Sequence, residues 1–258
     1  NLDAKLTSKQ KERFAVCCQR RLNGEPLAYI TGHRGFYGLD LQIDARVLDP
    51  RPDTETLVDW ALDVLRLTQQ PRVVDLGTGS GAIALALLHE RPDAQVVAVD
   101  ASADALAVAC ANATRLRLPV QCVQGSWLTP PHTSFPQTGT ENQTNAFPLA
   151  DNPRFDLIVS NPPYIAEGDS HLPALMHEPI QALTSGTDGL DAIRLITAQS
   201  PGCLKPGGWL LLEHGHDQVE AVTHLLRKQG FVNVQSRKDL AGIARCTGGQ
   251  WMPRADKA

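Results

Sequence analysis

The residues Ser160-Asn161-Pro162-Pro163-Tyr164 place an amide, two prolines and an aromatic ring directly after an apolar run. Because prolines exclude helix and interrupt strand pairing, this segment forms a fixed turn. The Asn161 amide and the Pro162 carbonyl offer two neighbouring hydrogen-bond acceptors, and the prolines add no N–H donor. Two acceptors orient a substrate NH2 group, and the Tyr164 ring gives it a flat face. We therefore predict that Asn161, Pro162 and Tyr164 are catalytic and that they bind the substrate together with Pro163.

The chemistry that this turn favours is methylation of a planar, conjugated NH2 group, such as adenine N6, cytosine N4 or a carboxamide nitrogen. These nitrogen atoms are weak nucleophiles, and no strong base accompanies the motif. Catalysis would then depend on holding the nitrogen in line with the methyl donor. It would also depend on acceptors that stabilise the positive charge developing on nitrogen.

A glycine-rich loop, Gly77-Thr78-Gly79-Ser80-Gly81, follows an earlier apolar run and begins a helix. Glycines let the backbone approach a ligand closely, and a helix start offers unpaired N–H groups. Asp100 ends the next apolar run, where a carboxylate can accept hydrogen bonds from both hydroxyls of a ribose. A nucleotide cofactor is expected. Gly77-x-Gly79-x-x-Ala82 also satisfies the dinucleotide pattern, so NAD remains an alternative.

Two features favour S-adenosylmethionine over NAD. Asp75 lies two residues before Gly77, where a carboxylate suits an ammonium group better than a pyrophosphate. The loop also has the tight G-x-G-x-G form. After the third strand, Trp127 could form a wall for the adenine and Ser126 could bond its amino group. The predicted cofactor residues are Asp75, Gly77, Thr78, Gly79, Ser80, Gly81, Asp100, Trp127 and Asn161; no metal ligands are predicted.

These residues follow short apolar strands that alternate with helices, which predicts an α/β fold with a mostly parallel, twisted sheet covered on both faces. Strands are expected at 72–76, 95–100, 120–124, 155–160 and 208–213, with a further pair near 231–237 and 242–247 that could include an antiparallel edge. Helices are expected at 4–22, 53–67, 81–91, 103–116, 189–202 and 217–229. Asp53 or Thr54 could cap the second of these helices.

Residues 1–52 do not show the strand–helix alternation of the rest of the chain. Residues 1–26 contain the helix expected at 4–22, with Leu6, Phe14, Val16 and Leu22 available for burial. Residues 27–52 are expected to form a β-hairpin linker, and 53–258 the main domain. The polar segment 129–153 reads as a surface loop insertion, to which we assign no function.

Composition limits the class of protein. The chain has 258 residues, 42% of them hydrophobic, which supports a substantial core. Its formal net charge of -4 argues against binding nucleic acid through bulk charge. The six cysteines contain no CxxC pair, which is typical of reduced thiols in a cytoplasmic protein. No apolar run is long enough for a membrane helix, and we expect no membrane association.

At these residues the sequence resembles the class I S-adenosylmethionine-dependent methyltransferases. Within them it is similar to the bacterial release factor glutamine methyltransferases, also called the PrmC or HemK family. The similarity extends over almost the whole chain. The matching segments are Gly24 to Leu27, RPDTE (51–55), DLGTGSGAIA (75–84), Ser160 to Ile165, Glu178-Pro179 and LLEHG (211–215). NPPY alone also occurs in nucleic-acid methylases, whereas RPDTE together with LLEHG is more specific.

The resemblance implies a Rossmann-like fold and methylation of the side-chain nitrogen (N5) of the glutamine in the Gly-Gly-Gln loop of class 1 peptide chain release factors. It implies that Gly77 to Gly81, Asp100, Trp127 and Asn161 contact S-adenosylmethionine, and that Asn161 to Tyr164 hold the glutamine. It also implies that residues 1–26 are the end of an N-terminal helical domain. Many family members have an acid where this chain has Ser126. We expect a monomeric, cytoplasmic enzyme that does not bind nucleic acid directly.

Two other functions compete with this one. A DNA or RNA adenine-N6 methyltransferase would use the same chemistry, but would need a basic recognition domain that the chain does not show. A silent S-adenosylmethionine-binding adaptor would not need NPPY. Arg51 to Glu55 could form a lid or simply start a helix. His214 and His216 suit packing at a strand end better than metal binding. The chain's own Gly248-Gly249-Gln250 is best explained as coincidence.

Overall fold

The computed structural model describes residues 6–129 and 154–253. Its helices are α1 (Ser8–Leu22), α2 (Leu27–Thr31), α3 (Glu55–Leu65), α4 (Ala82–Glu90), α5 (Ala103–Leu116), α6 (Asp191–Cys203) and α7 (Val219–Gln229). Its strands are β1 (His33–Phe36), β2 (Leu39–Gln42), β3 (Arg72–Leu76), β4 (Gln95–Asp100), β5 (Gln121–Gln124), β6 (Phe155–Ser160), β7 (Leu204–Glu213), β8 (Val232–Lys238) and β9 (Ala244–Gln250). Short 3-10 turns are η1 (Pro52–Thr54), η2 (Leu172–Leu175) and η3 (Ile180–Ala182).

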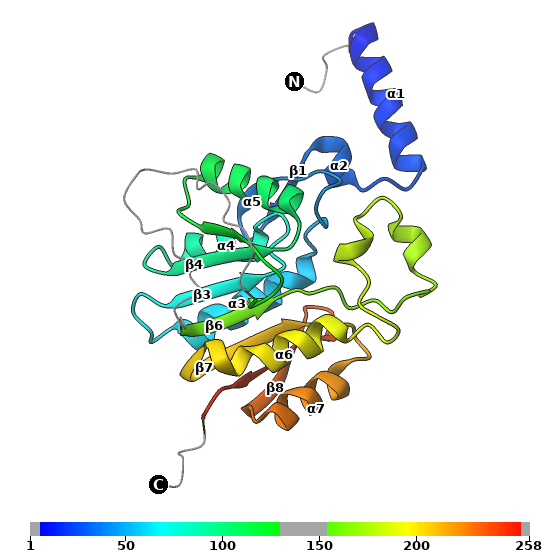
Figure 1. The fold of residues 1–258 in the computed structure, drawn as a ribbon. Helices are drawn as coiled ribbons and strands as arrows, with labels where there is room; N and C mark the ends of the chain where they lie inside the picture. The colour runs from blue at the N-terminus through cyan, green and yellow to red at the C-terminus, as the bar shows by residue number, and fades with distance from the viewer. Residues whose placement is uncertain (1–5, 130–153, 254–258) are drawn as a thin grey trace, which may run out of the picture.

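The main sheet has the strand order β5-β4-β3-β6-β7-β9-β8 and forms the centre of the molecule (Figure 1). Strands β3 to β7 pair in parallel, and β9 runs antiparallel to both of its neighbours. The predicted α/β fold, its mostly parallel sheet and its antiparallel pair near the edge are confirmed. The order reverses direction between β3 and β6, so their carboxyl ends and that of β4 border one crevice.

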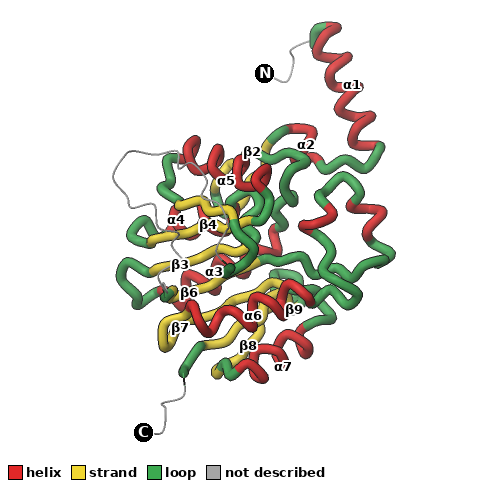
Figure 2. Tube along the Cα trace, viewed as in Figure 1, coloured by secondary structure: helices red, strands yellow, loops and turns green. Residues whose placement is uncertain are grey.

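Helices cover both faces of the sheet. Helices α3, α4 and α5 share one apolar cluster with the hairpin β1–β2, while α6 and α7 contribute to a second cluster on the opposite face. Figure 2 shows α6 and α7 in front of the strands and α3 behind them. The central strands are buried on both sides, which explains why their sequences are continuous apolar runs.

The N-terminal part differs from the prediction in two respects. Residues 27–31 form the short helix α2 instead of the start of the hairpin, which is limited to 33–42. Helix α1 begins at Ser8, later than predicted, because Thr7 and Gln10 form a capping box there. It buries none of its residues. The side chains that we expected to be available for burial remain 53–79% exposed: Leu6, Phe14, Val16 and Leu22.

The start of α3 also differs from the prediction. A 3-10 turn at Pro52–Thr54 precedes the helix, and the Thr54 side chain makes no capping hydrogen bond. The Thr54 backbone is already helical, with φ -64° and ψ -21°, whereas a capping residue is extended. Its hydroxyl accepts a hydrogen bond from Asn161 Nδ2. The first turn of α3 is thereby attached to the end of β6.

One predicted feature lies largely outside the described parts of the chain. The predicted insertion at 129–153 falls beyond the described residues except for Thr129. Within the described ranges, none of the helices is both long and apolar enough to cross a lipid bilayer.

Candidate active site

The glycine loop connects β3 to α4 and is fastened to β4. The N–H groups of Gly77 and Thr78 donate to the Val99 carbonyl over 2.8 and 2.9 Å. Gly79 has φ +56°, and a Cβ added there would meet nothing within 4 Å. A side chain at Gly79 would therefore adopt a strained backbone conformation and project into open space beside the cavity. The predicted close approach of a ligand to this backbone agrees with that geometry.

Asp75 lies beneath the loop and is completely buried. Its Oδ2 accepts hydrogen bonds from Thr78 Oγ1 over 2.6 Å and from the Ala84 N–H over 3.2 Å. Burial raises the pKa of this carboxyl to about 7, although these two hydrogen bonds oppose the rise. Asp75 lies outside the cavity wall, and its contacts hold the loop against the start of α4. Its predicted contact with an ammonium group stays a prediction.

Asp100, at the end of β4, faces the cavity. Its Oδ2 accepts from the Gly79 N–H and its Oδ1 from the Ser102 N–H, each over 2.9 Å. Burial raises its pKa, and these backbone donors oppose the rise by stabilising the ionised form. Because each carboxylate oxygen has two lone pairs, both can accept one further hydrogen bond. The predicted role toward two ribose hydroxyls therefore remains available.

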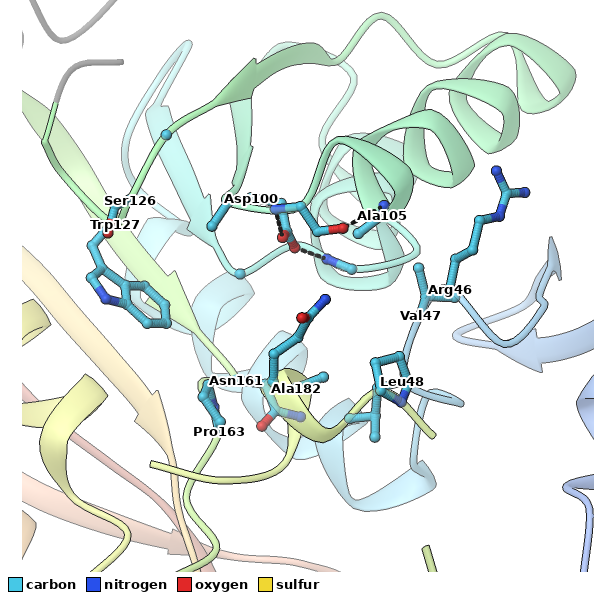
Figure 3. A pocket seen from close by; sticks show the side chains of 17 residues that line it. Arg46, Val47, Leu48, Asp100, Ala105, Ser126, Trp127, Asn161, Pro163 and Ala182 are labelled. Carbon is cyan, nitrogen blue, oxygen red and sulfur yellow. Dashed lines mark hydrogen bonds between the residues drawn. The ribbon is translucent and has the colours of Figure 1, made fainter. Parts of the chain in front are cut away.

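One cavity of about 370 Å³ brings several predicted site residues together. Its wall includes Gly77, Gly79, Asp100, Trp127, Asn161 and Pro163. Figure 3 shows Asp100, Trp127 and Asn161 around the same space. Ser126 also lines this space. Six predicted residues lie outside the lining: Asp75, Thr78, Ser80, Gly81, Pro162 and Tyr164.

The NPPY turn is fixed at the carboxyl end of β6. Ser160 Oγ donates to the Leu76 carbonyl over 2.6 Å, which joins the ends of β6 and β3. Asn161 Nδ2 donates to Thr54 Oγ1 over 3.2 Å. Asn161 also lines the cavity, and no hydrogen bond to its Oδ1 is present among the described residues, so this acceptor is available to a ligand. This arrangement provides one of the two acceptors predicted for a substrate NH2 group.

Behind the turn, Tyr164 packs close to the buried carboxyl of Glu213 at the end of β7. Burial raises the pKa of Glu213 to about 7, and the nearby hydroxyls of Thr54 and Tyr164 oppose the rise. Burial also raises the pKa of Tyr164. The Tyr164 carbonyl accepts from Gln218 Nε2 over 3.0 Å. This bond fixes the backbone of Tyr164 behind the turn.

A second part of the cavity wall, which we call the far wall, was not predicted from the sequence. It contains Arg46, Val47 and Leu48 before α3, and Pro179, Gln181 and Ala182 around η3. These two segments are joined by an ion pair between Arg51 and Glu178, and Glu178 Oε2 also accepts from the Asp49 N–H over 3.2 Å. The sequence signal for this contact was the pair of segments RPDTE and Glu178-Pro179, which we used only for the resemblance.

Comparisons with known proteins agree with this geometry. The family profile described as Methyltransferase small domain matches residues 54–188, and that described as PrmC N-terminal domain matches residues 1–32. A curated protein of Bordetella pertussis, named release factor glutamine methyltransferase, is 50% identical over 232 residues, which cover 89% of this chain and 79% of the relative. This chain belongs to the release factor glutamine methyltransferase family.

Further comparisons support the same family and fold. A release factor glutamine methyltransferase of Xylella fastidiosa strain Temecula1 is 46% identical over 250 residues, covering 96% of this chain and 84% of the relative. A solved methyltransferase structure from Pyrococcus furiosus has a TM-score of 0.56 at 16% identity and covers 96% of this chain and 100% of its own. The predicted resemblance is confirmed, and so is the class I methyltransferase fold.

Membership in a methyltransferase family implies use of S-adenosylmethionine, so the NAD alternative is not favoured. Three features of the cavity suit such a molecule. The Asp100 carboxylate retains acceptor capacity for ribose hydroxyls, Gly79 leaves its backbone accessible, and Trp127 offers an aromatic wall. These residues would hold the nucleoside part of the cofactor between β4 and the loop that contains Trp127.

Two other features singled out in the sequence have structural roles. His214 is buried and bonds to the Gly215 carbonyl and to Thr247 Oγ1, as the packing interpretation expects, whereas His216 is exposed. Gln250 belongs to β9. Its Nε2 donates to the Gly207 carbonyl and its Oε1 accepts from Asn233, each over 2.9 Å. Both ends of this amide are occupied, which agrees with coincidence as the explanation of the tripeptide.

Proposed function

We propose that this enzyme transfers the methyl group of S-adenosylmethionine to the side-chain amide nitrogen of the glutamine in the Gly-Gly-Gln loop of class 1 release factors. The observation that carries the proposal is the orientation of Asn161, whose Nδ2 is held by Thr54 while Oδ1 remains unpaired among the described residues. An acceptor fixed at the cavity suits a substrate that offers an NH2 group. The names of the relatives supply the protein substrate.

The residues of the NPPY turn would act by positioning. Asn161 Oδ1 and the Pro162 carbonyl accept the two N–H bonds of the glutamine amide, which fixes its plane and directs the nitrogen lone pair out of that plane. Pro163 and Tyr164 limit the space on either side. The bound cofactor would supply an electrophilic methyl group on a sulfonium. As positive charge develops on the nitrogen, the same two acceptors stabilise it, and the proton leaves after transfer.

The remaining site and domain assignments belong to the same proposal. Gly77 to Gly81, Asp100, Trp127 and Asn161 would contact the cofactor, and Asp75 would support the loop and the ammonium end. Residues 1–26 would end a helical domain, 27–52 would link it, and 53–258 would form the catalytic domain. We propose a monomeric enzyme that works in the cytoplasm, where release factors act, without binding nucleic acid directly.

The decisive experiment is peptide mass analysis of a purified release factor after incubation with this enzyme and S-adenosylmethionine. One added methyl group on the loop glutamine is expected. A release factor in which that glutamine is replaced by glutamate serves as the matched control and should gain nothing. If methyl groups appear only on an oligonucleotide supplied in parallel, the enzyme is an adenine-N6 methyltransferase and the proposal is wrong.

A further inference from the structure

Trp127 has an unusual backbone conformation in the cavity wall. Its φ of +54° lies in the left-handed region, which bulky residues rarely adopt and which strains the chain. Its indole projects into the cavity and lies close to the glycine loop (Figure 3). A Cβ added to Gly77 would lie 3.5 Å from Cζ3 of this ring. Because a strained residue persists only where its surroundings fix it, neighbouring contacts must hold Trp127 in place.

The turn from Ser126 to Thr129 surrounds Trp127. The segment before it is attached to the end of β4, where the Gly125 N–H donates to the Asp100 carbonyl over 3.0 Å. The turn itself is closed by the Thr129 N–H, which donates to the Ser126 carbonyl over 3.0 Å. These bonds fix the first half of the turn, whereas the second half needs a partner outside it.

Gln199 on α6 is that partner. Its Oε1 accepts from the Leu128 N–H over 3.1 Å, and its Nε2 donates to Thr129 Oγ1 over 3.2 Å. Both ends of the amide are used, which fixes its orientation. Within residues 6–129 and 154–253, Leu128 and Thr129 have no other hydrogen-bond partner outside the turn. Leu128 is buried, so losing Gln199 would leave its N–H unpaired in a buried position.

We propose that Gln199 is a positioning residue for the cofactor site. Its amide holds the turn in the conformation that directs the Trp127 indole into the cavity, where the ring borders the adenine of S-adenosylmethionine. Without Gln199 the strained backbone of Trp127 would relax, and the ring would no longer be held in the wall. Gln199 itself is not part of the cavity lining, so it acts through Trp127. This role rests on the proposed function only through its cofactor.

The test measures the Kd for S-adenosylhomocysteine by calorimetry in the full chain, with no release factor present. Trp127→Ala removes the ring and should weaken binding roughly 5- to 150-fold, as loss of base–aromatic stacking does. Gln199→Ala misplaces the ring and should weaken binding by about 4- to 20-fold, but not more than Trp127→Ala. Gln199→Glu is the matched control, because its carboxylate still accepts from the Leu128 N–H and from the Thr129 hydroxyl. Its Kd should stay within about twofold of wild type.

The double variant distinguishes positioning from general structural support. If Gln199 acts through the ring, adding Gln199→Ala to Trp127→Ala should change the Kd by less than about twofold. Binding should also quench tryptophan emission, and this quench should be lost in Trp127→Phe and reduced in Gln199→Ala at saturating ligand. Losses that multiply in the double variant, a wild-type Kd in Gln199→Ala, or an undiminished quench would overturn the role of Gln199 while leaving the proposed function intact.

Thermal unfolding of every variant accompanies the binding measurements, so that weaker binding is not mistaken for a lower fraction of folded enzyme. Gln199 is only partly buried, so Gln199→Ala should fold. If it does not, Gln199→Met, which keeps the side-chain length without the two hydrogen bonds, takes its place. If the wild-type enzyme does not bind S-adenosylhomocysteine, the cofactor assignment and the role of Gln199 fail together. If it binds the ligand but leaves a release factor unmodified, only the proposed substrate fails.

Discussion

Replacing Asn161 by alanine tests the reaction chemistry most directly. The substitution removes the acceptor Oδ1 at the cavity and also the 3.2 Å hydrogen bond to Thr54. Deleting one preorganised group that stabilises transition-state charge costs about 2.7–4 kcal/mol, or roughly 100- to 1000-fold in kcat. The lost hydrogen bond to Thr54 should reduce stability by only about 1 kcal/mol. In a chain of this size that lowers Tm by about 2–4 °C, so the variant should remain folded at 25 °C.

The assay is single-turnover methyl transfer to a release factor with saturating cofactor, since this isolates the chemical step from product release. Asn233→Ala is a suitable control, because it removes an exposed asparagine amide on β8 that bonds to Gln250 rather than to the site. The control should retain the wild-type rate. A folded Asn161→Ala variant with the wild-type single-turnover rate would refute the assignment of Asn161 as an acceptor for the substrate.

Three further outcomes follow from the geometry. Asp100→Asn places an amide where Gly79 and Ser102 both donate, so S-adenosylhomocysteine should bind roughly 10- to 100-fold more weakly by calorimetry. Gly189→Ala places a Cβ against the Tyr164 carbonyl at φ +74°, and should lower the free energy of unfolding by about 2 kcal/mol or more. Gly168→Ala is the control: its Cβ meets nothing within 4 Å, and it should lower the free energy of unfolding by about 1 kcal/mol. Burial raises the pKa of Glu213 to about 7, so its contribution to stability is present below the unfolded pKa near 4.5 and is lost as pH rises through 7. Glu213→Gln should therefore stabilise the chain more at pH 8 than at pH 5, by up to about 3 kcal/mol in chemical denaturation. The opposite pH trend would mean that the carboxyl is not buried as described.

The central strands could be predicted from sequence because burial on both faces makes them uninterrupted apolar runs. The predicted bounds 72–76, 95–100 and 155–160 agree with β3, β4 and β6. Helix α2 was missed because its sequence, LAYIT, contains residues that favour strands. Its helical form depends on tertiary contacts, including the bond from the Tyr29 hydroxyl to the Val47 carbonyl.

The part of the cavity wall formed by the glycine loop, Asp100 and Asn161 could be predicted, because these residues follow strands whose carboxyl ends meet at one edge of the sheet. The far wall could not, because it depends on contacts between distant segments. Arg51 and Glu178 are 127 residues apart in sequence and neither pattern alone indicates a pair. The link from Asn161 to Thr54 spans 107 residues and was missed for the same reason, although Thr54 had been expected to cap α3.

The strand β9 contains the same tripeptide that the enzyme is proposed to modify. There, Gly248 and Gly249 are paired with β7, and Gln250 uses both ends of its amide within the sheet. Identical side chains are thus present in a form that cannot enter the cavity. The enzyme would distinguish target from non-target by the accessibility of the backbone rather than by the three residues themselves. Copies of this tripeptide that are paired within strands of other proteins would then remain unmethylated. A copy in a loop that projects from its own domain would be recognised.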